Sequence, residues 1–169
     1  MIEITFPDGA SRSYEINSTP FDIANSISEG LSRNVISASF NGNTIETTTQ
    51  LKENGKLIFY TWNEQEGKKA FWHSSAHVLA QVLEELYSGI KLTIGPAISN
   101  GFYYDVDFGN HTMSEKDFPK IEKRMIEISR EKHLFKLKSI SKKEALDFYK
   151  NHKNEYKIEL IENLEDGTI

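Results

Sequence analysis

The first 62 residues carry a succession of strand, turn and helix patterns that limits the fold more than any other feature of the sequence. Residues 2–6 alternate apolar and polar side chains, which is typical of a strand with one buried face. Pro7-Asp8-Gly9 then predicts a tight turn, and residues 11–16 predict the returning strand. The chain therefore begins with a predicted β-hairpin.

A helix and three further strands are predicted after the hairpin. Thr19-Pro20-Phe21-Asp22 combines an N-cap, a proline at the first helical position and an acidic residue, and Gly30 offers a C-cap. Residues 36–40 predict a strand, Asn41-Gly42 is a strong hairpin signal, and residues 56–60 predict the closing strand. The order β-β-α-β-β-β is most simply satisfied by a sheet that grips one helix, the β-grasp or ubiquitin-like plan.

This plan predicts one apolar core shared by the sheet and its helix. The residues expected in that core are Ile4, Phe6, Phe21, Ile23, Ile27, Val35, Ile58 and Tyr60. The alternation of the closing strand puts Leu57 and Phe59 together on one of its faces. No pattern typical of a catalytic site appears in this part of the chain.

A pair of histidines dominates the next part of the chain. Residues 63–69 are polar, charged and interrupted by glycine, which predicts a domain boundary after Trp62. In the helical segment that follows, His73 and His77 are four residues apart, so they share one face with about 5–6 Å between their Cβ atoms. Two imidazoles placed in this way can act together on a metal, a water or a substrate.

The same helix predicts an apolar stripe that faces a core. Its expected members are Phe71, Ser75, Val78, Leu79, Val82 and Leu86. The histidines lie nearly opposite this stripe, beside Ala76, Ala80 and Glu84, so they are expected to face away from that core. The simpler alternative is that two partly exposed histidines share a helical turn without any function.

The remaining residues predict a second, mixed α+β domain. Its strands are expected at residues 91–94, 101–108 and 135–139. Its helices are expected to follow Ser114 with an apolar stripe of Ile121, Met125 and Ile128, at residues 141–149 and at residues 156–164. Residues 165–169 predict a turn and the start of another strand, so we expect the sequence to be cut from a longer chain.

Composition limits the chemistry further. The sequence has no cysteine, which removes disulfides, thiolate nucleophiles and the commonest zinc ligand sets. The net charge of -5 argues against a generally basic surface for nucleic acid, although lysines gather between residues 116 and 143. No charged-then-apolar leader and no apolar run of about 18 residues is present, so a cytoplasmic protein is expected.

The histidine spacing also occurs in zinc enzymes, but the sequence gives little support for a metal. The position after His73 is Ser74, so the glutamate of the zinc peptidase motif is not there. A third ligand would have to come from His111, His133, His152 or a carboxylate such as Asp105, and we expect no metal site. Phosphate-binding loops and serine nucleophile elbows are absent too, which leaves general acid–base chemistry or the positioning of a water.

Four segments resemble the threonyl-tRNA synthetases of the bacterial type. They are His73-Ser74-Ser75-Ala76-His77-Val78-Leu79, the run from Ile94 to Asp107, Glu122-Lys123-Arg124-Met125, and Tyr156-Lys157. The resemblance extends over the whole chain. It implies a TGS domain of β-grasp fold at residues 1–62 and the first, incomplete part of an editing domain at residues 63–169.

The resemblance implies that this region removes serine wrongly attached to threonine tRNA by hydrolysis, with water as the nucleophile. Carried over by position, His73, His77 and Lys157 would be the catalytic residues, and Tyr104 and Gly95 would bind the substrate. Tyr104 would contact the terminal adenosine or the ester region. His77 and Lys157 would place the water and polarise the ester, while His73 would contact the seryl group.

The family also implies features that lie outside this chain. Its aminoacylation domain uses ATP with magnesium and a zinc ion, its partner is tRNA(Thr), and it works as a cytoplasmic homodimer. Its editing pocket is completed by an Asp-x-Cys-x-x-x-His segment that this sequence lacks, so the chain alone is expected to be inactive and to carry no cofactor. Three alternatives remain open: an RNA-docking TGS module with no catalytic role, a regulatory TGS protein, or a metal-dependent hydrolase related to alanyl-tRNA editing proteins.

Overall fold

The computed structural model describes residues 1–135 and 138–165, and it confirms the α+β class. The chain forms two compact units, Met1–Trp72 and His73–Ile169. Helix α3 (Gln65–Leu86) begins in the first unit and continues in the second. The domain boundary expected after Trp62 stays a prediction.

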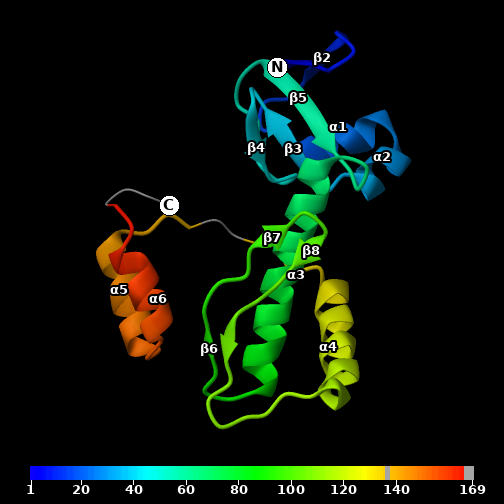
Figure 1. The fold of residues 1–169 in the computed structure, drawn as a ribbon. Coiled ribbons are helices and arrows are strands. Elements are labelled where there is room, and N and C mark those ends of the chain that lie inside the picture. The colour runs from blue at the N-terminus through cyan, green and yellow to red at the C-terminus, as the bar shows by residue number, and fades with distance from the viewer. Residues whose placement is uncertain (136–137, 166–169) are drawn as a thin grey trace. The chain divides into compact units, whose positions relative to one another are not determined.

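The first unit is a five-stranded mixed sheet with two short helices (Figure 1). The strands are β1 (Ile2–Thr5), β2 (Ser11–Tyr14), β3 (Ser37–Phe40), β4 (Asn43–Ile45) and β5 (Gly55–Tyr60), in the order β2-β1-β5-β3-β4. The central pair β1 and β5 is parallel, with Ile4 opposite Gly55, and the other pairs are antiparallel. A parallel central pair flanked by hairpins, with a helix between them in sequence, is the predicted β-grasp arrangement.

One apolar core holds this unit together. It consists of Ile2, Ile4, Phe6, Ile23, Ala38, Leu51 and Leu57. The expected core was wrong for β5, where Leu57 and the half-buried Phe59 face the core and the alternate residues Ile58 and Tyr60 do not belong to it. Successive side chains of a strand point to opposite faces, so a wrong choice of face moves every residue of that strand.

The helix expected after Thr19 is two helices, α1 (Pro20–Ile27) and α2 (Glu29–Asn34). Thr19 and Asp22 form the predicted capping box, but the helix stops at Ser28, which is the C-cap of α1 and the N-cap of α2. The buried face of α1 is made by Pro20, Ile23 and Ala24. Phe21 and Ile27 lie off that face and are 47% and 39% exposed, so both were wrongly expected in the core.

The second unit contains helices and two very short β-ladders. Its elements after α3 are β6 (Lys91–Leu92), β7 (Ala97–Ile98), β8 (Gly101–Phe102), β9 (Val106–Asp107), the 3-10 turn η1 (Glu115–Asp117), α4 (Phe118–Glu131), α5 (Lys142–Asn151) and α6 (Glu155–Glu162). Strand β6 pairs with β9 and β7 with β8, both antiparallel. The two ladders belong to one hairpin, because the amide of Thr93 donates to Asp105 and the amide of Asp105 donates to Ile94.

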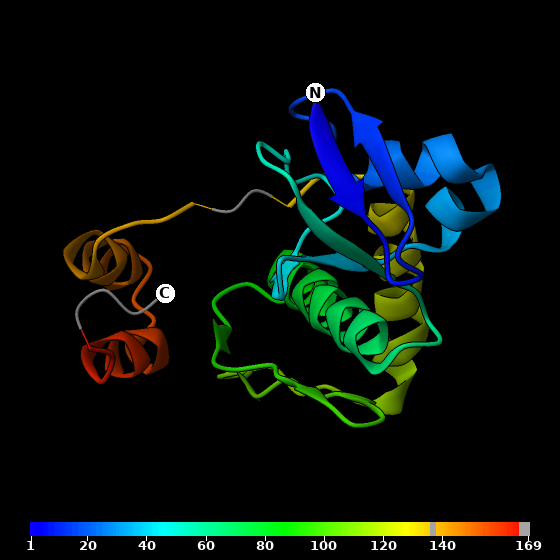
Figure 2. The same ribbon diagram turned by 90° about the horizontal axis from the view of Figure 1, so that it is seen from above.

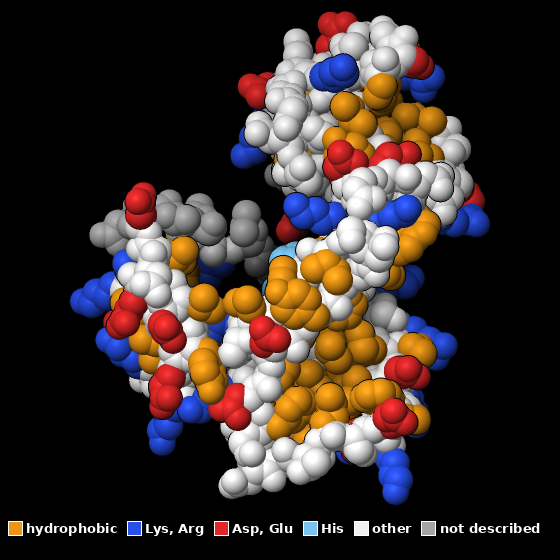
Figure 3. All heavy atoms as spheres, viewed as in Figure 1, with side chains coloured by type: hydrophobic (Ala, Val, Ile, Leu, Met, Phe, Trp, Pro, Cys, Tyr) orange, Lys and Arg blue, Asp and Glu red, His pale blue; other side chains and the backbone are white. Residues whose placement is uncertain are grey.

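The core of this unit lies where α4 and the hairpin pack on α3 (Figures 1 and 2). Val82, Leu83, Ile121 and Ile128 are buried there, and Val78, Leu79, Leu86 and Met125 pack around them. The predicted stripes of both helices are confirmed, except that Phe71 is 47% exposed and contacts the ring of Trp62 edge-on. Apolar side chains nevertheless remain visible on the face of this unit drawn in Figure 3.

Two sequence expectations fall wholly or partly outside the described residues. The strand expected at residues 135–139 includes residues 136–137, and the strand expected to begin near the end of the chain lies within residues 166–169. The helices expected at residues 141–149 and 156–164 are confirmed as α5 and α6. Among the described residues, no helix is both long and apolar enough to cross a membrane.

Candidate active site

His73 and His77 are in direct contact on one face of α3. Their Nε2 atoms are 3.1 Å apart, and their rings meet edge-on with centroids separated by 4.6 Å. This is the arrangement that the four-residue spacing predicts. One ring nitrogen donates a hydrogen bond to the other, so the two imidazoles form a single polar unit rather than two independent side chains.

The surroundings of His77 favour its neutral form. The pKa of His77 is lowered, mainly because the ring is partly withdrawn from water, and further by the nearby charges of His73 and Lys157. The ring of Phe135 is also near His77, with 6.0 Å between the ring centroids. When His77 is the ring that donates through Nε2, its Nδ1 keeps a free lone pair, so His77 can accept a proton there at neutral pH.

The face of α3 that carries the histidines is more enclosed than the sequence suggested. Ala76 and Ala80 beside the pair are only 2% and 7% exposed, although neither belongs to the apolar core on the opposite side of the helix. Small side chains let other segments approach the helix closely. The histidine pair therefore lies at the edge of a covered surface, with its rings still accessible.

Lys157 extends this site from a different helix. It lies in the first turn of α6, half-buried, and its charge is close enough to lower the pKa of His77. Burial lowers the pKa of Lys157 itself, and the carboxylate of Glu84 opposes that shift by favouring the charged ammonium. Lys157 thus acts on His77 through its charge, although the two residues are about 80 positions apart in the sequence.

Tyr104 and Gly95 form a second part of the same neighbourhood. A Cβ atom placed on Gly95 would lie 2.2 Å from Cδ2 of Tyr104, so the tyrosine ring rests directly on the glycine backbone. The pKa of Tyr104 is raised, first by burial and then by the negative charge of Glu84 and by Tyr149. Gly95 thus fixes the position of an aromatic ring, a role that only a residue without a side chain can take here.

Glu84 is the site residue to which the sequence gave no role. It follows His73, His77 and Ala80 at helical spacing on the same face of α3, and its carboxylate acts on both Lys157 and Tyr104. The spacing of 4, 3 and 4 residues was visible in the sequence. It could have identified Glu84 as a third polar member of the histidine face.

The other histidines of the chain have partners away from this pair. The ring Nε2 of His111 contacts the carbonyl of Ser88 at 2.9 Å, that of His133 contacts Glu131 at 2.7 Å, and Nδ1 of His152 contacts the carbonyl of Phe148. Within residues 1–135 and 138–165, no three side chains of the metal-binding types come together. The described residues thus supply the histidine pair with no third ligand.

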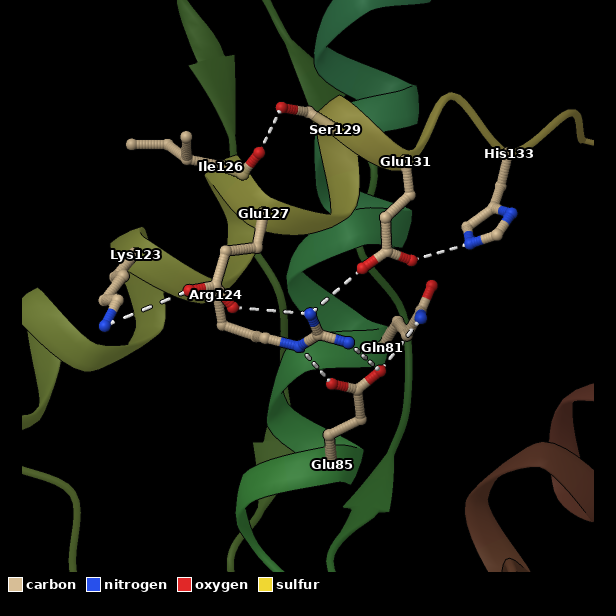
Figure 4. A network of polar contacts seen from close by, with 9 residues as sticks. All are labelled: Gln81, Glu85, Lys123, Arg124, Ile126, Glu127, Ser129, Glu131 and His133. Atoms are coloured by element: carbon tan, nitrogen blue, oxygen red, sulfur yellow. Dashed lines mark hydrogen bonds and ion pairs between the residues drawn. The ribbon is translucent and has the colours of Figure 1, made fainter.

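A polar network on the neighbouring helix holds α4 against α3 (Figure 4). Nε of Arg124 is 2.6 Å from Glu85 on α3, and its Nη1 is 3.2 Å from Glu131. The hydrogen bonds with Arg124 lower the pKa of Glu85, and His133 and then Arg124 lower that of Glu131. Because Glu85 follows Glu84 directly, this network is attached to the helix that carries the site.

The sequence of this chain is similar to a known domain family and to known ligases. A family model described as the TGS domain matches residues 2–61. Over its whole length the chain is 63% identical to the threonine–tRNA ligase of Flavobacterium psychrophilum, 48% to that of Cytophaga hutchinsonii and 47% to that of Bacteroides thetaiotaomicron. The chain is homologous to the N-terminal, TGS-containing part of threonine–tRNA ligases.

The chain spans about a quarter of the length of these ligases, since each match covers 26% of the relative. The resemblance to threonyl-tRNA synthetases drawn from the sequence is confirmed, as is the TGS domain of β-grasp fold. The roles of His73, His77, Lys157, Tyr104 and Gly95 stay predictions, because similarity to a ligase of this name assigns no role to a single residue.

Proposed function

We propose that this chain is the region of a threonine–tRNA ligase that edits its product, by hydrolysing the ester bond of seryl-tRNA(Thr). The observation that carries the proposal is the contact between His73 and His77, and it is supported by the charge of Lys157 on another helix, which helps to lower the pKa of His77. Hydrolysis of an aminoacyl ester requires a general base, a positive charge that stabilises the developing negative oxygen, and a site that the substrate can reach.

The need for such a reaction follows from the size of the two amino acids. Serine differs from threonine by the absence of one methyl group, and a difference of that size is worth only about 1–3 kcal/mol in a binding pocket. A ligase that must be more accurate than this gains from a second, hydrolytic site. The relatives are named for threonine, so serine is the smaller competitor that such a site would remove.

In the proposed mechanism the neutral His77 takes a proton from a water molecule, whose oxygen attacks the ester carbonyl carbon. The ammonium of Lys157, whose charged form burial disfavours and Glu84 favours, stabilises the negative oxygen of the tetrahedral intermediate. When the intermediate collapses, the bond to the ribose oxygen breaks and protonated His77 returns the proton to that oxygen. The products are free serine and uncharged tRNA. His73 contacts the seryl group, and Tyr104 lies beside the terminal adenosine.

The same proposal places the chain in a larger protein. That protein attaches threonine to tRNA(Thr) with ATP and magnesium, holds a zinc ion in its aminoacylation domain, and acts as a homodimer in the cytoplasm. None of these cofactors is assigned to residues of this chain. The alternative is a TGS module that only docks RNA, and the experiment below separates the two.

The test uses the chain by itself and a chimera in which it replaces the matching quarter of the Flavobacterium psychrophilum ligase. Both are mixed with seryl-tRNA(Thr), and release of serine is followed over time. We expect His77→Ala to slow hydrolysis by the chimera at least about 100-fold, because general acid–base catalysis typically contributes a factor of about 10²–10⁴.

His111→Ala is the matched control, since His111 is also exposed and its ring contacts a backbone carbonyl away from the histidine pair. It should leave the rate unchanged. A chimera that binds seryl-tRNA(Thr) but does not hydrolyse it, or one that hydrolyses it equally well with His77→Ala, would favour the docking module instead.

A further inference from the structure

Helix α6 is anchored to the hairpin by its first turn. The side-chain amide of Asn154 donates to the carbonyl of Leu92 at 2.9 Å, and the hydroxyl of Tyr156 is 3.1 Å from the carboxylate of Asp107. Lys91 is 3.5 Å from Glu155. All three contacts join the start of α6 to the β6–β9 ladder, so the position of this helix is set at the end that carries Lys157.

Asn154 differs from the other two anchors in its surroundings. The side chain of Glu155 is 81% exposed and Tyr156 is also exposed, so solvent weakens both of their contacts. Asn154 is half-buried, and the carbonyl that it binds belongs to Leu92, which is 7% exposed. A hydrogen bond to a carbonyl held away from water is costly to leave unmade.

Asn154 also acts on Lys157 directly. It is the N-cap of α6, and its side-chain oxygen accepts the backbone N–H of Lys157 at 3.1 Å. One side chain therefore donates to the strand and accepts from the residue that carries the ammonium group. Neither Tyr156 nor Glu155 has a described hydrogen bond or ion pair that makes both connections.

We propose that Asn154 is a positioning residue of the candidate active site, which ties α6 to strand β6 and so holds Lys157 beside His73 and His77. This inference rests on the proposed function for its importance in hydrolysis. Its geometric part can be tested without any substrate, because the nearby Lys157 lowers the pKa of His77.

The experiment is an NMR titration of the His77 ring in the whole chain. A reference variant, Lys157→Met, removes the charge and should raise the midpoint of the His77 titration. Asn154→Ser keeps a hydroxyl that can cap α6 but is too short to reach Leu92, and it introduces no charge. We expect it to raise the midpoint toward the value of Lys157→Met, and Asn154→Ala to do so at least as much.

Asn163→Ser is the matched control. Asn163 is the C-cap residue of the same helix, and among the described residues its side chain donates to the carbonyl of Glu159 within α6. It should leave the His77 midpoint where it is in the unaltered chain. A shift caused by Asn163→Ser as large as that of Asn154→Ser would mean that any disturbance of α6 has the same effect, and would overturn the inference.

Two further outcomes separate this inference from the proposed function. If Asn154→Ser leaves the midpoint unchanged while Lys157→Met raises it, Asn154 does not position Lys157. If neither variant raises the midpoint, Lys157 does not act on His77 and the inference is wrong as well. If Asn154→Ser raises the midpoint but the chimera never hydrolyses seryl-tRNA(Thr), the positioning stands and the editing reaction is wrong. In an active chimera, Asn154→Ser should slow hydrolysis in proportion to the midpoint shift.

Discussion

The first unit buries Ile4, Ile23 and Leu57 completely under a five-stranded sheet, whereas the described ladders of the second unit are two residues long and its core is built mainly between helices. The pKa shifts follow the opposite trend. Burial is the largest cause of the shifts of His77, Tyr87, Tyr104 and Lys157, and all four residues belong to the second unit. The difference teaches that in this chain the five-stranded sheet and the candidate chemistry belong to different units, and that the start of α6 is joined to the hairpin by side-chain contacts rather than by a continuous ladder.

The largest expected effect is that of Leu57→Ala in the first unit. Leu57 is fully buried, so the variant should lower the free energy of unfolding of this unit by about 2–5 kcal/mol. Urea denaturation followed by the fluorescence of Trp62 and Trp72 measures it, because the chain has 2 tryptophans and both lie in this unit. At urea concentrations below the unfolding transition that tryptophan fluorescence reports, the variant should leave the midpoint of the His77 titration unchanged.

Ile16→Ala serves as the control for Leu57→Ala, because Ile16 is an aliphatic residue of the same unit that is 53% exposed. Its effect should be small. If the two variants lose the same stability, the core of the first unit is not what distinguishes it. A shift of the His77 midpoint with Leu57→Ala in the folded state would show that the units are not independent.

A smaller effect is expected for Gly95→Ala in the second unit. The added Cβ cannot fit beneath Tyr104 unless the ring moves, and overpacking of this kind costs about 1–3 kcal/mol. The Tyr104 ring signals in an NMR spectrum should shift, and so should the His77 midpoint if the hairpin is displaced. Gly30→Ala in α2 is the control, since the nearest atom to its added Cβ is 3.9 Å away.

If Gly95→Ala leaves both the Tyr104 signals and the stability unchanged, the close approach of ring and backbone is not maintained in solution. The second unit would then be looser around the site than the comparison with the first unit assumes. An equal loss of stability with Gly30→Ala would point to a general cost of replacing glycine rather than to this contact.

The smallest effect is expected for Arg124→Met. Arg124 lowers the pKa values of Glu85 and Glu131, so the stability that it contributes is present above their ordinary pKa of about 4.3 and is lost as pH falls through the lowered values. The difference in unfolding free energy between variant and unaltered chain should therefore be visible at pH 7. It should narrow below about pH 4 and in about 1 M salt.

Arg33→Met in the first unit sharpens this measurement. Arg33 makes a single contact of 2.6 Å with Glu29, and both side chains are at least 75% exposed, so it should matter even less. Urea denaturation of both variants at two salt concentrations measures how much stability each one loses and how far that loss depends on salt. A loss for Arg124→Met that does not depend on salt would mean that packing of its stem, rather than charge, joins α4 to α3.

Local chemistry allowed much of the fold to be predicted. The turns at Pro7-Asp8-Gly9 and Asn41-Gly42, and the capping boxes of Thr19, Ser114 and Ser141, depend on residues within a few positions of each other, and all of them form. The predictions that were wrong depend on residues that are distant in the sequence. Nothing near Ile58 reveals that the core contacts Leu57 instead, since that choice is made by β3 and β1 on either side.

The candidate site divides in the same way. The contact between His73 and His77 follows from helical spacing alone, whereas the approach of Lys157 depends on how Asn154 meets Leu92, which lies 62 residues earlier. The resemblance to a known family supplied Lys157 and Tyr104 from matching segments, without the geometry. It could not supply Glu84, whose influence on both residues appears only when α3, α6 and the hairpin are together.

The contact between the two histidines also restricts which ring nitrogen of each residue carries a proton. With both Nε2 atoms turned toward each other, a neutral pair needs one ring protonated on Nε2 and the other on Nδ1, so the two identical residues must be opposite tautomers. Nitrogen-15 spectra would then show one ring with the signal pattern of the Nε2-protonated tautomer and one ring with that of the Nδ1-protonated tautomer. Replacing either histidine frees the other to change its tautomer, so each single variant alters both members of the pair.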